Sequence, residues 1–150
     1  MTGGGRMFLD LDDRVIDKKM KQVVKALEKQ DKEAIRDMFS KQALEEAEDF
    51  DENLDLLYTF FEEGSILWKR SGGPGTYEHL AISHMLKEIE ATYDMESKNQ
   101  QYHASIKICT KNDDNPGNIG ILSFCIIPAE KWTENCNYWG NLDICGITID

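Results

Sequence analysis

The sequence predicts an α+β protein in which a helical first half precedes a β-rich second half. From Asp10 to Glu63, apolar residues recur every three or four positions, which is typical of amphipathic helices. From Gly64 onward, apolar and polar residues alternate, and Asp113–Gly120 is rich in turn formers. Helices followed by strands favour an α+β layer over alternating βαβ units.

The composition indicates one globular domain. The chain has 150 residues, of which 41% are hydrophobic and 30% charged, unlike disordered or membrane-spanning chains. Its net charge of −11 creates an average field that repels phosphate backbones and anionic headgroups. We therefore expect no nucleic-acid partner and no binding to a lipid surface.

The first residues indicate a tether rather than a secretory signal, because they lack a basic segment followed by an apolar one. We expect residues 1–11 to be a flexible N-terminal tether and residues 12–150 to be the folded domain. Two interpretations remain open. Either the protein is cytoplasmic, or a signal has been removed and Thr2–Arg6 is the remnant of a flexible tether.

The cysteines do not predict a metal site. There are four, with no CxxC pair and only three histidines among them. We expect buried free thiols at Cys109, Cys125, Cys136 and Cys145, with a Cys136–Cys145 bridge as the alternative. The acidic Asp113–Asn118 segment lacks the ligand spacing of an EF-hand and is interpreted as a turn. No cofactor and no metal ligand is predicted.

The first helix is predicted to begin at a cap around Asp10 or Asp12 and to run to about Lys29. Its apolar residues form one stripe: Ile16, Met20, Val23, Val24 and Leu27. One face of this helix is therefore expected to pack on the core.

Three further helices are predicted from their capping residues. Asp31 and Ser40 are suited to cap the second and third helices, and Asp51 the fourth, which ends at Gly64. The apolar stripe of the fourth helix comprises Leu54, Leu57, Tyr58 and Phe61.

The β half opens with an alternating segment, Ile66–Arg70, that Ser71–Thr76 is expected to break. Tyr77–Ser83 receives no assignment. A final apolar segment, Cys145–Ile149, is expected to pair as an edge strand or to pack as a lid.

The clearest pattern is a hairpin with its turn at Ser97–Gln100. This turn pairs apolar residues on one dry face: Met95 with Tyr102, Tyr93 with Ala104, Ala91 with Ile106 and Ile89 with Ile108. The other, wet face pairs Asp94 with His103, Thr92 with Ser105 and Glu90 with Lys107. The returning strand Gly120–Pro128 is placed with Leu122, Phe124 and Ile126 beside Ile108, Ile106 and Ala104.

Five aromatic residues are candidates to line a ligand pocket between helices and sheet: Tyr58, Phe61, Trp68, Tyr93 and Tyr102. The alternative is that they fill the core. Asp94 and His103 could form a general acid–base pair, but alternation places them on the wet face, where a cross-strand ion pair is the simpler interpretation. No catalytic residue is assigned.

Three segments carry a family resemblance: Asp31–Gly64, NPGNIGILSF at 115–124 and YWGNLDICGI at 138–147. The chain resembles the DUF5104 proteins, mostly lipoproteins of Firmicutes with an NTF2-like (cystatin-like) fold. The resemblance implies a cone of helices packed in a curved antiparallel sheet. It also implies extracytoplasmic location through a lipid-carrying cysteine that this chain lacks.

We therefore expect a non-catalytic extracytoplasmic NTF2-like module that binds a small molecule or a partner protein. The alternative is an NTF2-like isomerase or dehydratase that uses a pocket carboxylate. A homodimer joined through the wet sheet faces is a third possibility. Membrane contact is expected only through the lipid anchor of a precursor.

Overall fold

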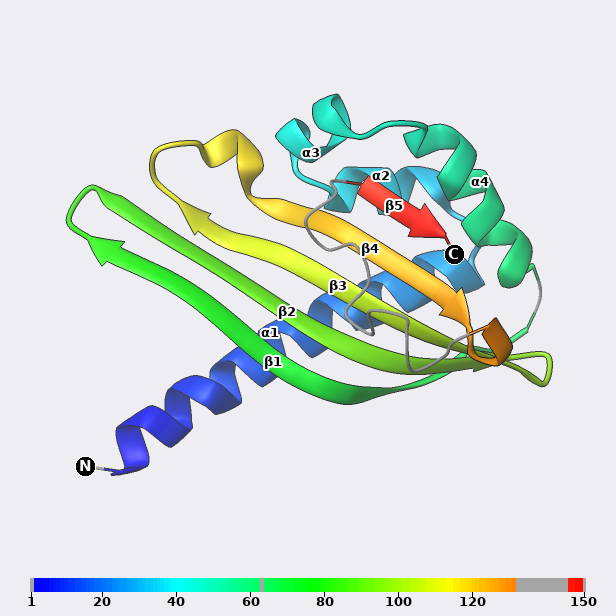
Figure 1. Ribbon diagram of the computed structural model, residues 1–150, viewed down its shortest axis with the longest axis horizontal. Coiled ribbons are helices and arrows are strands. Elements are labelled where there is room, and N and C mark those ends of the chain that lie inside the picture. The colour runs from blue at the N-terminus through cyan, green and yellow to red at the C-terminus, as the bar shows by residue number, and fades with distance from the viewer. Residues whose placement is uncertain (1, 63, 132–145, 150) are drawn as a thin grey trace.

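The computed structural model describes residues 2–62, 64–131 and 146–149, and it confirms an α+β fold (Figure 1). Four helices come first: α1 (Thr2–Glu28), α2 (Lys32–Met38), α3 (Lys41–Glu46) and α4 (Phe50–Phe60). The strands follow: β1 (Leu67–Ala81), β2 (His84–Ser97), β3 (Gln100–Asn112), β4 (Gly120–Pro128) and β5 (Gly146–Ile149). Short 3₁₀ turns lie at Pro116–Asn118 and Ala129–Lys131.

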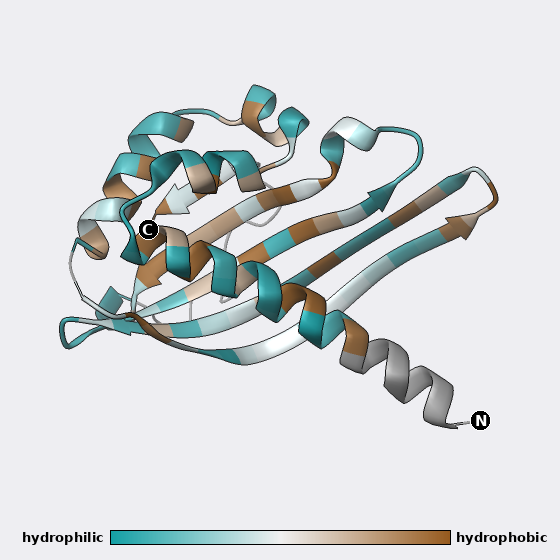
Figure 2. Ribbon diagram, turned by 180° about the vertical axis from the view of Figure 1, so that it is seen from behind, coloured by the Kyte–Doolittle hydropathy of each residue, from teal (hydrophilic) through white to brown (hydrophobic). Residues whose placement is uncertain are grey.

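The five strands form one mixed sheet in the order β1-β2-β3-β4-β5. The first four strands are antiparallel, and β5 runs parallel to β4 as an edge strand. The edge-strand prediction for the last apolar segment is confirmed, and the lid alternative is wrong. The helices lie on one side of the sheet, with α1 crossing it diagonally (Figures 1 and 2).

α1 begins earlier than predicted. Its backbone is helical from Thr2 through the residues expected to be a tether, so the predicted start at Asp10 or Asp12 is wrong. Asp12 is 4% exposed inside the helix instead of capping it. The predicted apolar stripe is buried as expected: Ile16, Met20, Val23, Val24 and Leu27.

The predicted caps of α2 and α3 are confirmed. The Asp31 carboxylate accepts a hydrogen bond from the Ala34 N–H at 3.1 Å, and the Ser40 hydroxyl accepts one from the Ala43 N–H at 2.9 Å. The cap of α4 is Asp49 rather than Asp51. Asp49 has left-handed backbone angles and makes no side-chain cap hydrogen bond, which removes the signal that capping residues normally provide.

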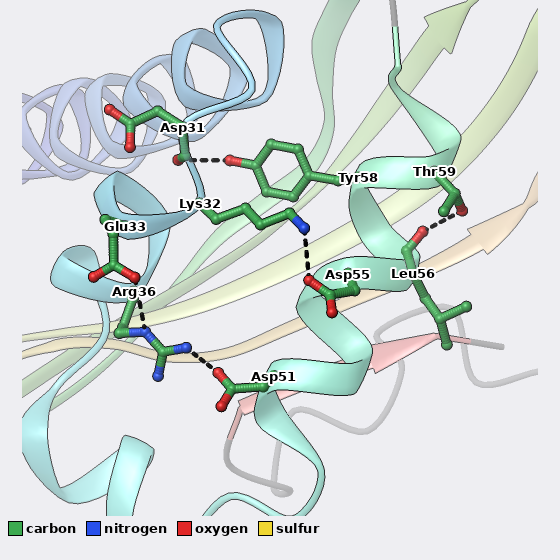
Figure 3. Close-up of polar contacts among 9 residues, drawn as sticks. All are labelled: Asp31, Lys32, Glu33, Arg36, Asp51, Asp55, Leu56, Tyr58 and Thr59. Atoms are coloured by element: carbon green, nitrogen blue, oxygen red, sulfur yellow. Dashed lines mark hydrogen bonds and ion pairs between the residues drawn. The ribbon is translucent and has the colours of Figure 1, made fainter.

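Ion pairs join α2 to α4 (Figure 3). Lys32 Nζ lies 2.7 Å from an Asp55 carboxylate oxygen, and the Arg36 guanidinium pairs with Asp51. The Tyr58 hydroxyl of α4 donates to the backbone carbonyl of Asp31 at 2.7 Å. These contacts fix α4 beside α2.

The central hairpin has the predicted register, with Tyr93 opposite Ala104 and Asp94 opposite His103. Its turn places Lys98 and Asn99 at φ of 53° and 65°, the left-handed pair that a two-residue type I′ turn requires. The alternation and the turn together determine this register.

The Gly-rich segment of β1 does not break the strand, which corrects the prediction. β1 continues to Ala81 through irregularities in its pairing with β2 between Arg70 and Gly75. A Cβ at Gly72 would lie 2.6 Å from Thr92 Oγ1, and one at Gly73 would lie 2.9 Å from the Glu90 carbonyl. Glycine is needed here because the two strands approach closely.

The register of β4 is predicted in part. Phe124 pairs with Ile106 and Ile126 pairs with Ala104 as expected. Ile108 pairs with Ile121 rather than Leu122, because a bulge between Lys107 and Ile108 shifts the register by one residue.

The face expected to be wet is only partly so. At its centre Thr92, Ser105 and Ser123 are 0%, 2% and 1% exposed. Cys109 and Cys125 are buried, as predicted. The alternative Cys136–Cys145 bridge falls outside the described residues. We call this side of the sheet, opposite the helices, the outer face.

Candidate functional site

The five predicted pocket aromatics lie mainly in the core between the helices and the sheet. Tyr58, Phe61, Tyr93 and Tyr102 are buried, and Trp68 is partly buried against them. The Tyr102 ring lies 5.0 Å from that of Phe60 and 5.1 Å from that of Phe61, between ring centroids. Trp68 and Tyr93 are in contact at 5.8 Å. Mutual ring packing accounts for the positions of Phe61, Trp68, Tyr93 and Tyr102.

The hydroxyl groups of two of these tyrosines are bound within the protein. Tyr93 donates to Asp17 of α1 at 2.7 Å, and Tyr58 donates to the carbonyl of Asp31. Burial first, and the nearby carboxylate second, raise the pKa of each phenol well above its usual range. A ligand on this side of the sheet would have to displace these contacts.

A hollow of about 380 Å³ lies at the end of the sheet where Asp94 and His103 face outward. The strand pairing forms two rows across this outer face, Lys69–Asp94–His103 and Leu67–Glu96–Gln101. Trp68, Met95 and Tyr102 alternate with these residues and also border the hollow. The structure thus brings two of the predicted aromatics next to the predicted acid–base pair.

Asp94 and His103 form a short polar contact in the hollow. Asp94 Oδ1 and His103 Nδ1 are 2.9 Å apart, and the side chains are 41% and 24% exposed. The prediction that the pair lies outside the helix–sheet core is confirmed by the register. A hydrogen bond to the carboxylate requires the proton on Nδ1, so Asp94 orients the imidazole and selects its tautomer.

Lys69 contributes the cation of this hollow. Asp94 lies between Lys69 and His103 in the register but bonds to the histidine. Within the described part of the chain, the Lys69 ammonium forms no ion pair and no hydrogen bond. The arrangement can hold a ligand that accepts hydrogen bonds from Lys69 and Gln101 and donates to Glu96.

A second hollow of about 470 Å³ lies further along the same face, beside Tyr77. Lys107 Nζ approaches Glu88 to 3.7 Å at its edge. Both hollows are concave polar areas of the outer face, and the first contains the oriented histidine.

A group of charged residues fastens α1 to β1 and β2, and we call it the clasp. Asp12 lies 2.7 Å from Lys87 Nζ and accepts a hydrogen bond from the Thr76 hydroxyl at 2.9 Å. Arg70 pairs with Asp13 at 2.7 Å and with Asp17 at 3.3 Å. The Asp12 hydrogen bond is the main cause that raises the pKa of Lys87. The clasp comprises Asp12, Asp13, Asp17, Arg70, Thr76, Lys87 and Tyr93.

Several of these residues were not predicted. The alternating pattern around Lys69 predicts a strand but no role in a site. The glycine-rich segment that follows gives no indication that β1 pairs with β2. The clasp was missed because aspartates near a helix start are usually solvated or capping residues. The available signal was that Asp13 and Asp17 lie on one helix face, while Arg70 is the last residue of a segment with β alternation.

Neither a metal site nor a membrane span is found in the described ranges. In residues 2–62, 64–131 and 146–149, no group of three or more His, Cys, Asp or Glu is placed to hold an ion. Over the same ranges, no helix has the length and apolar character to cross a bilayer.

The fold and the site define a small α+β domain with a packed helix-facing core and a polar hollow on the outer face of its sheet. The family model described as domain of unknown function (DUF5104) matches residues 22–129. This match covers more than half of the chain, and the protein belongs to the DUF5104 family. A comparison with curated proteins found no match.

Proposed function

We propose that this protein is a non-catalytic binding module whose ligand occupies the hollow beside Asp94 and His103. The observation that supports this is the difference between the two sides of the sheet. The helix-facing side is filled with packed rings, whereas the outer side has a hollow of about 380 Å³. That volume suits a small molecule or a short segment of a partner protein.

The chemistry of the hollow favours a polar ligand. Lys69 and Gln101 can donate hydrogen bonds, Glu96 can accept them, and Leu67 offers apolar surface at the rim. The oriented His103 ring adds a flat surface with a defined tautomer. A ligand with both donors and acceptors, attached to a small apolar group, meets these features.

Ligand-observed NMR with a library of small polar compounds tests the proposal. Compounds that bind the wild-type chain should bind Lys69→Gln and His103→Gln about tenfold more weakly, because the first change removes the cation of the hollow and the second removes the oriented imidazole ring. Trp68→Ala should also weaken binding, because Trp68 borders the hollow. Lys98→Gln, in the β2–β3 turn, is the matched control. Equal binding to all of these variants would show that the hollow is not the site.

An NTF2-like isomerase or dehydratase is the second candidate, favoured by the 2.9 Å contact that orients His103. In that case His103 exchanges a proton with the substrate while Asp94 holds the ring. Turnover of any compound that binds should then fall by about 10²–10⁴ in Asp94→Ala and His103→Ala. Binding without turnover in the wild-type protein supports the binding module.

We also propose the finer classification that the resemblance implies: an NTF2-like, lipid-anchored, extracytoplasmic protein of Firmicutes. The helix-first order, the helices on one side of a curved sheet and the family membership support it. Fractionation of the full gene product, with and without an inhibitor of lipoprotein signal peptidase, tests the anchor. An unlipidated product in the cytosol would support the cytoplasmic alternative. Sedimentation velocity tests the outer-face homodimer.

A further inference from the structure

α1 separates its charged residues by sign onto two faces. From Asp12 onward its acidic residues contact the β half: Asp12, Asp13 and Asp17 belong to the clasp, and Glu28 accepts a hydrogen bond from the Ile66 N–H at 2.9 Å. Apart from Lys19, which is partly buried, the basic residues from Arg14 onward turn toward solvent in a line with spacings of three or four residues. This basic stripe comprises Arg14, Lys18, Lys21, Lys25 and, one residue beyond the helix, Lys29, all of which are exposed.

The stripe is a cationic surface on an acidic protein. Residues 14–29 hold six basic and two acidic residues, which gives this segment a net charge of +4. Because the whole chain has a net charge of −11, the remaining residues together carry −15. The two acidic residues, Asp17 and Glu28, are both engaged toward the sheet. Among the described residues, no ion pair or hydrogen bond is shown for the side chains of the stripe.

Two apolar residues extend the stripe toward the start of α1. Leu11 and Val15 are 46% and 40% exposed and lie in line with Lys18 on the helix surface. From Arg14 to Lys29 the stripe is about 22 Å long at 1.5 Å per residue. Figure 2 shows α1 in front of the sheet on this side of the molecule. A straight, exposed line of cations with apolar residues at one end is therefore available to a partner.

We infer that the basic stripe of α1 docks the protein on an anionic lipid surface. Lysines and arginines attract anionic headgroups, and exposed apolar side chains beside them can enter the boundary between headgroups and acyl chains. A soluble polyanion would need the cations alone, so Leu11 and Val15 favour the lipid surface.

The overall negative charge does not oppose this docking at contact distance. Screening limits charge interactions to about 8 Å at physiological salt, so the stripe experiences the lipid surface more strongly than the acidic remainder does. The acidic remainder instead orients the molecule with α1 toward the lipid. The hollow of the outer face lies on the opposite side of the sheet from α1, so this inference is independent of the proposed function.

Vesicle co-sedimentation tests the inference with the whole chain. The wild-type protein should bind vesicles of phosphatidylcholine mixed with phosphatidylglycerol, more strongly as the phosphatidylglycerol fraction rises and more weakly as salt is added. The triple variant Lys18→Gln, Lys21→Gln, Lys25→Gln should lose binding, on the order of fivefold per charge. Glutamine keeps the helix propensity of lysine, and circular dichroism checks the fold.

The matched control is the triple variant Lys41→Gln, Lys98→Gln, Lys111→Gln. Both triple variants change the net charge from −11 to −14, since each removes three of the 17 basic residues against 28 acidic ones. The control should bind like the wild type. Equal loss in both variants, or no wild-type binding to phosphatidylglycerol at low salt, overturns the inference.

A second variant separates lipid from soluble polyanions. Leu11→Ser with Val15→Ser should weaken vesicle binding and leave binding to inorganic polyphosphate unchanged. If the wild-type chain binds polyphosphate but does not bind the vesicles, the inference of docking on lipid is wrong. The stripe would then be a site for a soluble polyanion.

Discussion

The two halves of α1 are attached to the sheet by different forces. The C-terminal half buries an apolar stripe, in which Met20 and Leu27 are fully buried. The N-terminal half is held by the clasp, in which Asp12 and Arg70 are paired with residues of opposite charge. The apolar half gains free energy in proportion to buried area, whereas the clasp depends on complete pairing.

This difference shows how one helix can be stable along its length without a continuous apolar face. Apolar packing does not depend on protonation or on the screening of charges, and its loss leaves a cavity. A paired charge is sensitive to both, and removal of one partner leaves the other in a partly buried site. Four predictions test this contrast.

Leu27→Ala should have the largest effect. We expect a loss of about 3 kcal/mol in the free energy of unfolding, because Leu27 is fully buried and the site becomes a cavity. Urea denaturation measures the loss. Leu56→Ala, on the exposed side of α4, is the control and should cost less than about 0.5 kcal/mol. Similar losses in both variants would contradict a packed core under this half of α1.

Asp12→Ala should cost about 2 kcal/mol, because it leaves the Lys87 ammonium, whose side chain is 26% exposed, without its main partner. The double variant Asp12→Ala, Lys87→Met should recover part of the loss. A double-mutant cycle by urea denaturation measures the coupling. Strictly additive losses would mean that the two residues do not interact.

Alkaline pH should weaken the clasp next. Tyr93 and Lys87 have raised pKa values in the folded state, so they hold their protons longer than in the unfolded chain. The contribution of these two groups to the free energy of unfolding is complete below their ordinary pKa values near 10. Above those values it is lost, by up to about 1.4 kcal/mol for each group and each pH unit. The slope of stability between neutral pH and about pH 11 should be smaller in Tyr93→Phe. An unchanged slope would exclude Tyr93 as a contributor.

Lys32→Gln should have the smallest effect, about 0.5 kcal/mol or less. The Lys32 and Asp55 side chains are 48% and 65% exposed, so solvent screens their ion pair between α2 and α4. Asp55→Asn should give the same small change in thermal unfolding. A cost as large as that of Asp12→Ala would remove the distinction between exposed pairs and the clasp.

Much of the fold could be predicted because local patterns determine it. The hairpin register follows from strict alternation around a two-residue turn, and the Asp31 and Ser40 caps follow from the preference for a side-chain acceptor at a helix start. Asp49 was missed because it makes no such bond. The shift at Ile121 depends on a bulge that periodicity does not reveal.

The site was harder to predict because its residues meet only through the tertiary structure. The contact of Asp94 with His103 was predicted, since both lie in one hairpin. Lys69 joins them through pairing with a strand whose continuity a glycine-rich segment conceals. The clasp joins residues far apart in the sequence, and charge patterns on separate elements do not identify their partners.

The irregular middle of β1 also affects how readily its edge can pair with a strand of another chain at high protein concentration. β1 is an edge strand of 15 residues, long enough to serve as a template for another chain. Its pairing shifts between Arg70 and Gly75, and Pro74 has no N–H to offer at the centre. The free edge is therefore divided into two short segments. A regular strand in this position would expose a continuous row of donors and acceptors. The segment that obscured the strand in the sequence interrupts this row and so shortens the template that another chain could pair with.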